Sequence, residues 1–299
     1  MPATIPKCNK GECCSKGLYQ EIPINTWDEL QALYCRERKD WSKRWVFRGQ
    51  KSSTWCLTTT LERTFLKRLG YPSLIEAREW ENLLLRQFKR NAPRLLNQPP
   101  RNEDYMEWLA LMRHYGAPTR LFDWTYSFWV ALYLAIESVE VTGTCAVWAL
   151  DIDWWKDCVK ERMPVLKEIL KKGSNTPKEF NFILNRKDKP GIWPVNPFRL
   201  NERLYAQQGI FVLPIDVTKP FMENLRALVR QNQGADHLCK IVITCDRDLL
   251  TSCLTELHRM NINSATLFPG LDGLARNLEN QIFMPQLFTD VPDKESDLR

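Results

Sequence analysis

Apolar residues recur with helical spacing in several separated stretches of the chain. The clearest is residues 73–89, where large apolar side chains return every three or four positions. Residues 126–139 are apolar on nearly every face, which predicts a buried central helix. Similar reasoning predicts the following further helices: 27–34, 104–113, 165–172, 221–230, 248–260 and 271–279.

Short runs of β-branched and aromatic residues predict strands between these helices, at 45–47, 144–150, 210–214 and 240–245. The helices interrupt the strands irregularly, and no glycine-rich phosphate loop follows a strand, so we predict an α+β fold with a small mixed sheet surrounded by helices. Residues 177–197 are expected to form a long polar connection. We expect three parts: a flexible segment 1–24, one domain 25–282, and a polar tail 283–299.

Composition adds a mild charge bias. The chain has 299 residues and a formal net charge of +6, spread along the sequence, which is compatible with a nucleotide or nucleic-acid ligand. It shows no secretory signal and no apolar run long enough to span a membrane, so we expect a cytoplasmic protein without membrane association. Cys8, Cys13 and Cys14 resemble half of a metal site, but no second cysteine pair lies nearby, and we expect no metal there.

The densest polar stretch is residues 113–125, which lie at a predicted break between two helices. Gly116 and Pro118 fit the end of the first helix. Asp123 or Thr125 is expected to cap the second helix. These roles in ending one helix and capping the next leave four residues unexplained: His114, Tyr115, Arg120 and Trp124.

Four motifs follow one another along the chain. They are Phe47-Arg48-Gly49-Gln50 after a strand, His114 to Thr125 before a buried helix, Asn201-x-Arg203-x-x-x-Gln207-Gln208-Gly209-x-Phe211 before a strand, and Leu267-Phe268-Pro269-Gly270-Leu271-Asp272-Gly273-Leu274-Ala275. In this order they resemble the FRG domain, a family of bacteria and phages named for its Phe/Tyr-Arg-Gly motif. The resemblance covers most of the predicted domain. It implies a single domain whose motifs converge on one cleft, in antiviral-defence or mobile-element settings.

A strand that ends in Phe/Tyr-Arg-Gly is also similar to the arginine-class ADP-ribosyltransferases. In those enzymes the arginine and the neighbouring backbone hold NAD, so the similarity implies a transferase of toxin type with NAD as its cofactor. Their Ser-Thr-Ser strand has no counterpart here, since Ser52-Ser53-Thr54 comes too soon after the arginine. Neither Glu202 nor Glu256 has the Gln or Glu two positions earlier that marks the catalytic glutamate of that family.

Each motif residue also has a purely structural interpretation. Arg48 suits a phosphate, with Gly49 allowing close approach of a ligand, but a buried ion pair with Asp123 explains it equally well. His114 could act as a general base, or could simply stabilise a helix C-terminus. Arg120 could hold an anion at a helix N-terminus, or could pair with Asp123 to fix the turn.

We therefore predict a nucleotide-directed enzyme that resembles the ADP-ribosyltransferases, with a non-catalytic module that senses a nucleotide or nucleic acid as the alternative. A nuclease is disfavoured because no cluster of acidic metal ligands is visible. Side-chain amides after residue 206 could read a base edge or hold a ribose, or could cap a loop. The expected catalytic residues are His114, Asp123 and Glu202. The expected ligand-binding residues are Phe47, Arg48, Gly49, Gln50, Tyr115, Thr119, Arg120, Trp124, Arg203, Gln207 and Gln208.

Overall fold

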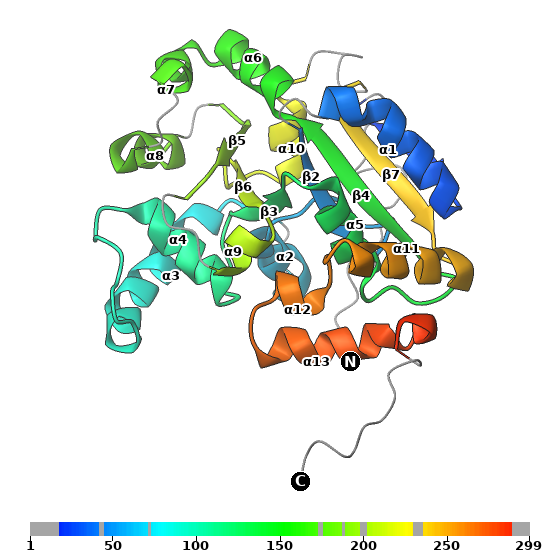
Figure 1. Cartoon of the computed structure of the whole chain (residues 1–299). Helices are drawn as coiled ribbons and strands as arrows, with labels where there is room; N and C mark the ends of the chain where they lie inside the picture. Colours follow the sequence, from blue (N-terminus) through cyan, green and yellow to red (C-terminus); the bar gives the residue numbers. More distant parts are fainter. Residues whose placement is uncertain are drawn as a thin grey trace.

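One mixed sheet forms the centre of the protein (Figure 1). The computed structural model describes residues 18–41, 45–70, 73–172, 176–186, 189–197, 202–229 and 236–288. Within these ranges the strand order is β1-β7-β4-β2-β3-β6-β5, with β1 and β7 parallel and every other neighbouring pair antiparallel. The strands are β1 (Gln20–Ile24), β2 (Trp45–Gln50), β3 (Phe122–Thr125), β4 (Thr144–Asp151), β5 (Ile192–Val195), β6 (Gly209–Pro214) and β7 (Leu238–Thr244).

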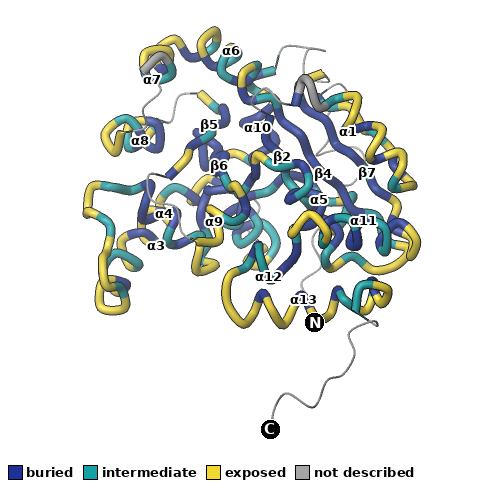
Figure 2. Tube along the Cα trace, viewed as in Figure 1, coloured by how far each residue is buried: buried dark blue, intermediate teal, exposed yellow. Residues whose placement is uncertain are grey.

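Helices cover both faces of this sheet and bury most of its strands, as Figure 2 shows, although the edge strand β1 (Gln20–Ile24) is largely exposed. The α-helices are α1 (Trp27–Trp41), α2 (Thr60–Arg63), α3 (Ala77–Asn91), α4 (Tyr105–His114), α5 (Phe128–Ile136), α6 (Ile152–Arg162), α7 (Lys167–Lys172), α8 (Pro177–Leu184), α9 (Glu202–Ala206), α10 (Phe221–Arg226), α11 (Arg247–Arg259), α12 (Ser264–Leu267) and α13 (Leu271–Gln281). Four short helices of other types are η1 (Thr64–Arg68), η2 (Ala92–Leu95), η3 (Pro164–Leu166) and η4 (Pro285–Leu287).

The two faces have separate hydrophobic cores because side chains alternate along a strand. In β4, Val147 packs into the core that contains residues of α1, α5 and α11. Its neighbour Trp148 packs into the other core, with residues of α4, α6, α8 and α10. The predicted fold class, an α+β single domain with a mixed sheet surrounded by helices, is confirmed.

The predicted strands at 144–150, 210–214 and 240–245 are confirmed as β4, β6 and β7. Periodicity likewise located α4, α11 and α13 to within two residues at each end. The apolar stripe predicted for residues 73–89 consists of Leu74, Ala77, Trp80, Leu84 and Phe88. It is only partly correct, because Trp80 is 40% exposed while Glu81 is buried. The buried side of α3 therefore contains a charge, and the ion pair described below explains it.

The predicted end of the first helix is confirmed: α4 ends at His114, and Gly116 follows it with a left-handed backbone at φ 79°. The predicted cap of the second helix, Asp123 or Thr125, is wrong. Residues Phe122–Thr125 form β3, which pairs with β6 in the middle of the sheet. Ser127 is the N-cap of α5, and its Oγ accepts a hydrogen bond from the backbone N–H of Val130 at 3.3 Å. Thr125 instead donates from Oγ1 to the carbonyl of Gln207 at 2.6 Å, which ties β3 to the turn before β6.

Two other segments also differ from the sequence prediction. The expected polar connection at 177–197 contains α8 and the edge strand β5. Residues Gln20–Ile24, assigned by sequence to the flexible N-terminal segment, form β1 alongside β7. Both strands lie at the edges of the sheet, and each contains a proline, which argues against a strand in the sequence but is tolerated at a sheet edge.

Candidate functional site: an arginine cluster around Asp123

Arginines from four different elements surround Asp123 of β3. Arg113, in the last turn of α4, donates from Nε to Asp123 Oδ2 at 2.9 Å, and its Nη2 donates to the same oxygen. Arg48 of β2 donates from Nη1 to the backbone carbonyl of Asp123. Arg203 of α9 interacts electrostatically with Asp123, as does Arg63 of α2. We call Arg48, Arg63, Arg113 and Arg203 the arginine cluster.

The segment that leads into α2 orients two members of the cluster. Thr60 Oγ1 accepts from Arg113 Nη1 at 2.5 Å and from Arg63 Nη2 at 3.3 Å. Arg63 Nη1 also donates to the carbonyl of Thr58 at 2.6 Å. A single threonine hydroxyl therefore holds two guanidinium groups side by side.

Aromatic rings support the other two members. The guanidinium carbon of Arg48 lies 3.9 Å from the centre of the Phe122 ring, and that of Arg203 lies 4.7 Å from the centre of the Phe268 ring. Planar guanidinium groups stack well on aromatic faces. Phe268 belongs to the fourth sequence motif, so the structure brings that motif to the cluster.

The cluster contains more positive than negative charge. Burial, together with the charges of Arg113 and Arg63, lowers the pKa of Arg48 to about 9 against the opposing effect of Asp123. Burial also lowers the pKa of Arg203, with Arg113 contributing in the same direction. Burial disfavours the charge of Asp123 too, but Arg113, Arg48 and Arg203 together hold the pKa of Asp123 below its ordinary value. Asp123 is therefore ionised and is shared by several cations.

Two cavities lie against the cluster. The smaller, about 140 Å³, is lined by Ala110, Arg113, His114, Gly116, Asp123, Arg203, Leu204, Gln207 and Phe211. The larger, about 310 Å³, is lined by Arg48, Gly49, Gln50, Lys51, Trp55, Cys56, Thr58, Arg63, Leu134, Glu137 and Ser138. The hydrogen bond from Arg48 to Asp123 links a residue of one cavity to a residue of the other.

Glu137 is a glutamate of the larger cavity that sequence reasoning did not identify. It is the residue that follows α5, and Ser264 Oγ donates to its Oε2 at 3.3 Å. Burial raises the pKa of Glu137, and the charges of Arg276 and Arg203 oppose that shift. A carboxyl group with a raised pKa in a cavity is a candidate for proton transfer.

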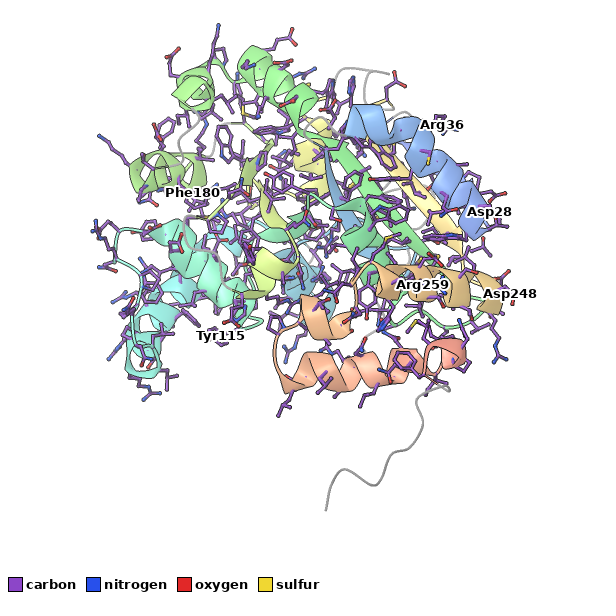
Figure 3. The ribbon with its side chains drawn as sticks, viewed as in Figure 1. Asp28, Arg36, Tyr115, Phe180, Asp248 and Arg259 are labelled. Carbon is purple, nitrogen blue, oxygen red and sulfur yellow. The ribbon has the colours of Figure 1, made fainter. Side chains whose placement is uncertain are left out.

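His114 and Glu202, two of the expected catalytic residues, have different surroundings. His114 lines the smaller cavity, and burial together with the charge of Arg203 lowers its pKa, which favours the neutral imidazole. Glu202 begins α9 and is exposed, and neither cavity lining includes it. Tyr115, labelled in Figure 3, is 65% exposed next to His114.

Arg120 lies in the core, away from both cavities. Its Nε donates to both carboxylate oxygens of Glu81, at 2.9 and 2.7 Å, and Nη2 donates to Oε2. Its Nη1 reaches the carbonyls of Leu184 and Ile215. The ion pair considered between Arg120 and Asp123 is wrong, since Glu81 is the partner of Arg120 and Arg113 the partner of Asp123.

Several other expected ligand-binding residues are also buried in the core. Phe47 packs against the rings of Trp41 and Phe128. Thr119 and Trp124 are also buried, and they line neither cavity.

Gly49 and Gln50 line the larger cavity, but each also has a structural task. A Cβ on Gly49 would lie 2.1 Å from the carbonyl oxygen of Ala131, so this glycine lets α5 pack against β2. Gln50 accepts from Trp148 Nε1 at 2.8 Å and donates to the carbonyl of Cys56 at 3.2 Å.

The two glutamines before β6 take separate roles. Gln207 lines the smaller cavity, while its Nε2 donates to the carbonyl of Leu267 at 3.1 Å. Gln208 is exposed, has a left-handed backbone with φ 47°, and its carbonyl accepts from the backbone N–H of Tyr126. The structure therefore brings Arg48, His114, Asp123, Arg203 and Gln207 together.

Within the ranges that the structure describes, no group of three or more His, Cys, Asp or Glu side chains could hold a metal ion. The cysteines considered as half of a metal site, Cys8, Cys13 and Cys14, lie outside the described residues. Crossing a bilayer takes a long apolar helix, and none occurs in the described part of the chain.

Comparison with known proteins identifies one family. The family model of the FRG domain matches residues 43–142, which supports the FRG resemblance for this third of the chain. The matched segment contains Arg48, Arg113, Asp123 and Glu137, whereas Arg203 lies outside it. No curated protein and no solved structure matches the chain.

Proposed function

We propose that this chain is a nucleotide-directed transferase, similar to the ADP-ribosyltransferases, whose arginine cluster holds the phosphates of NAD. The observation that supports the proposal is the excess of positive charge around Asp123. Four guanidinium groups share one ionised carboxylate that Arg113 already engages. Partly buried like charges repel strongly unless an anion compensates them, and guanidinium forks match phosphate oxygens.

Arg48 has hydrogen-bonding capacity left for such an anion. Its Nη1 is used by the carbonyl of Asp123, but among the described residues nothing accepts a hydrogen bond from its buried Nε. The larger cavity, about 310 Å³, is at the lower end of the range for small-molecule sites. One nucleoside half of NAD would occupy it, with the phosphates against Arg48 and Arg63.

The transfer itself needs a proton acceptor. The glycosidic bond between nicotinamide and ribose breaks, nicotinamide leaves with the bonding electrons, and the ribose carbon bonds to the acceptor's nucleophile. The nucleophile's proton passes to a carboxylate. We assign this role to Glu137 because it lines the same cavity as Arg48 and has a raised pKa. A neutral His114 lies on the other side of the cluster and orients the acceptor. The defence or toxin setting comes from the family resemblance.

Calorimetric titration of the full chain tests the binding step. NAD and ADP are expected to bind, and adenosine, which lacks phosphates, to bind at least ten-fold more weakly. Arg48→Gln should weaken NAD binding by roughly ten-fold or more, the usual effect of losing a hydrogen bond to a charged group. Arg94→Gln, at an exposed arginine outside both cavities, is the matched control and should change nothing. Equal binding of adenosine and ADP would overturn the proposal.

Release of nicotinamide, with water as the acceptor of the ribosyl group, tests the chemical step separately. Glu137→Gln should keep NAD binding and lose nicotinamide release. Wild-type protein that binds NAD without releasing nicotinamide would exclude the transferase and leave the second candidate function, a non-catalytic nucleotide or nucleic-acid sensor. That candidate is favoured by Asp123, whose carboxylate is engaged by Arg113 and is therefore poorly placed to accept a proton. Binding of oligonucleotides that falls steeply with salt would support it.

A further inference from the structure

A series of buried hydrogen bonds leads to Glu137, the residue assigned above as proton acceptor. Asn280 of α13 donates from Nδ2 to Tyr133 Oη of α5 at 2.9 Å. The hydroxyl oxygens of Tyr133 and Ser264 lie 2.7 Å apart, and Ser264 Oγ donates to Glu137 Oε2 at 3.3 Å. Asn280, Tyr133 and Ser264 are 5%, 2% and 0% exposed, so they are shielded from bulk water. We call these three residues the donor series.

The direction of the hydrogen bonds is fixed at both ends of the donor series. An amide Nδ2 only donates, and a carboxylate only accepts. Burial raises the pKa of Tyr133, and the charge of Glu137 acts in the same direction, so the phenol keeps its proton. Because Ser264 uses its hydrogen on Glu137, the hydroxyl of Tyr133 is the donor to Ser264 Oγ. Every donor in the series therefore points toward the Glu137 carboxylate.

The short helix α12 holds Ser264 in place. Asn263 caps α12, since its side chain accepts from the backbone N–H of Thr266 at 3.1 Å, while Thr266 Oγ1 accepts from the backbone N–H of Asn263 at 3.2 Å. Helices α12 and α13 lie side by side (Figure 1). A Cβ on Gly273 of α13 would lie 2.7 Å from the carbonyl oxygen of Ser264, so this close contact requires glycine. The backbone of Ser264 is thus fixed from two sides.

The hydrogen bond from Ser264 acts on both the charge and the orientation of Glu137. Burial disfavours the charged carboxylate, and the Ser264 hydrogen bond opposes this effect, as do the charges of Arg276 and Arg203. The other basic residues that line the same cavity are Arg48, Lys51 and Arg63. A cation attracts either carboxylate oxygen, whereas a fixed hydroxyl engages one of them. Since Oε2 accepts from Ser264, Oε1 is the oxygen left for a proton from the substrate.

We propose that Ser264 is the positioning residue for Glu137, and that Tyr133 and Asn280 align its hydroxyl. The inference rests on the proposed function, in which Glu137 accepts the proton of the attacking nucleophile. In that step the bond between the nucleophile and its proton breaks, the proton moves to Oε1, and the electron pair forms the bond to the ribose carbon. Ser264 keeps its own proton throughout. Ser264 and Asn280 both lie outside the segment that the family model matches.

Titration of the Glu137 carboxyl group tests the hydrogen bonds without NAD. NMR of the full chain, isotopically labelled at glutamate Cδ, follows the carboxyl groups, and the signal that Glu137→Gln removes is that of Glu137. Ser264→Ala should raise the proton affinity of Glu137 about ten-fold or more, the usual effect of losing a hydrogen bond to a charged group. Tyr133→Phe should act in the same direction, because hydrogen bonds in series polarise one another.

Tyr34→Phe is the matched control for this titration. Tyr34 packs in the same hydrophobic core as Tyr133, and its hydroxyl makes no hydrogen bond to another described residue. The control should titrate like the wild type. Tyr133→Phe keeps the test valid if Ser264→Ala does not fold. The proposal is overturned if the folded variants of Ser264 and Tyr133 leave the titration of Glu137 unchanged.

The pH dependence of nicotinamide release tests the positioning role. In Ser264→Ala the acidic limb of the kcat profile should move to higher pH, with kcat about ten-fold lower on that limb. KM for NAD should stay the same, because Ser264 does not line the cavity. A purely structural role would lower stability without moving the limb, and that result would overturn the positioning role. Wild-type protein that releases no nicotinamide would overturn the proposed function together with this role, whereas the carboxyl titration would still decide whether the donor series controls the ionisation of Glu137.

Discussion

The ion pair between Arg120 and Glu81 leads to a quantitative prediction about stability. Both residues are almost fully buried, at 2% and 3% exposure. Glu81 accepts from the backbone N–H, Nε and Nη2 of Arg120, and Nη1 of Arg120 reaches the carbonyls of Leu184 and Ile215. Glu81→Ala would leave a buried guanidinium with only these two carbonyl partners. Removing one member of a buried pair costs about 3–5 kcal/mol, because the remaining charge is uncompensated.

Urea unfolding followed by tryptophan fluorescence measures this loss. Glu81→Ala should therefore lower the free energy of unfolding by about 3–5 kcal/mol and shift the urea midpoint to lower concentration. Arg120→Met should cost a similar amount by leaving the carboxylate unpaired. The double variant Glu81→Met with Arg120→Met should recover most of the stability, because it removes both charges and keeps side chains of similar volume.

The double variant also decides between a structural and a ligand-binding role for Arg120. If Arg120 only links α3 to the segment before β3, the stable double variant should bind NAD like the wild type. A loss of less than 1 kcal/mol in Glu81→Ala would refute the burial argument. A stable double variant that no longer binds NAD would show that Arg120 contributes to the ligand site after all.

Three further stability predictions follow from buried groups. Burial raises the pKa of Glu62 from 4.5 to about 7, so ionisation of Glu62 destabilises the folded state. The free energy of unfolding should therefore fall by about 3 kcal/mol as the pH rises from about 4.5 through 7. Glu62→Gln should flatten this decline in urea unfolding measured at a series of pH values. Gly49→Ala would place a Cβ 2.1 Å from Ala131 O and should cost roughly 1–3 kcal/mol in thermal unfolding, whereas an unchanged melting temperature would show that α5 shifts freely. Thr125→Val removes the hydrogen bond to the carbonyl of Gln207 and should cost about 1–3 kcal/mol, with wild-type stability counting against a role for that bond.

Sequence reasoning succeeded where a segment's own side chains determine its surroundings. The runs that became β4 and β7 are mostly apolar because both faces of these strands are largely buried. Helix α5 is apolar all round because it lies between the sheet and other helices. β3 was missed because it has only four residues, of which Asp123 is half-buried, in a segment rich in polar groups. Its pairing with β2 and β6 depends on residues far away in the chain.

The candidate site also depends on residues far apart in the chain, and the partner of Asp123 is the clearest example. From spacing, Arg120 and Arg48 are natural partners, since one is three positions away and the other belongs to the Phe-Arg-Gly motif. Arg113 is ten positions away, but the chain turns after α4 and brings the last turn of that helix over β3. Arg120 is meanwhile directed toward α3, where Glu81 occupies a position whose spacing predicts an apolar residue. The presence of Glu81 on an otherwise apolar face of α3 was therefore the one indication in the sequence that Arg120 has a structural role. Once Arg120 is assigned to the core, the arginines that remain near Asp123 come from four elements, and their shared charge makes this the part of the described chain best suited to an anion.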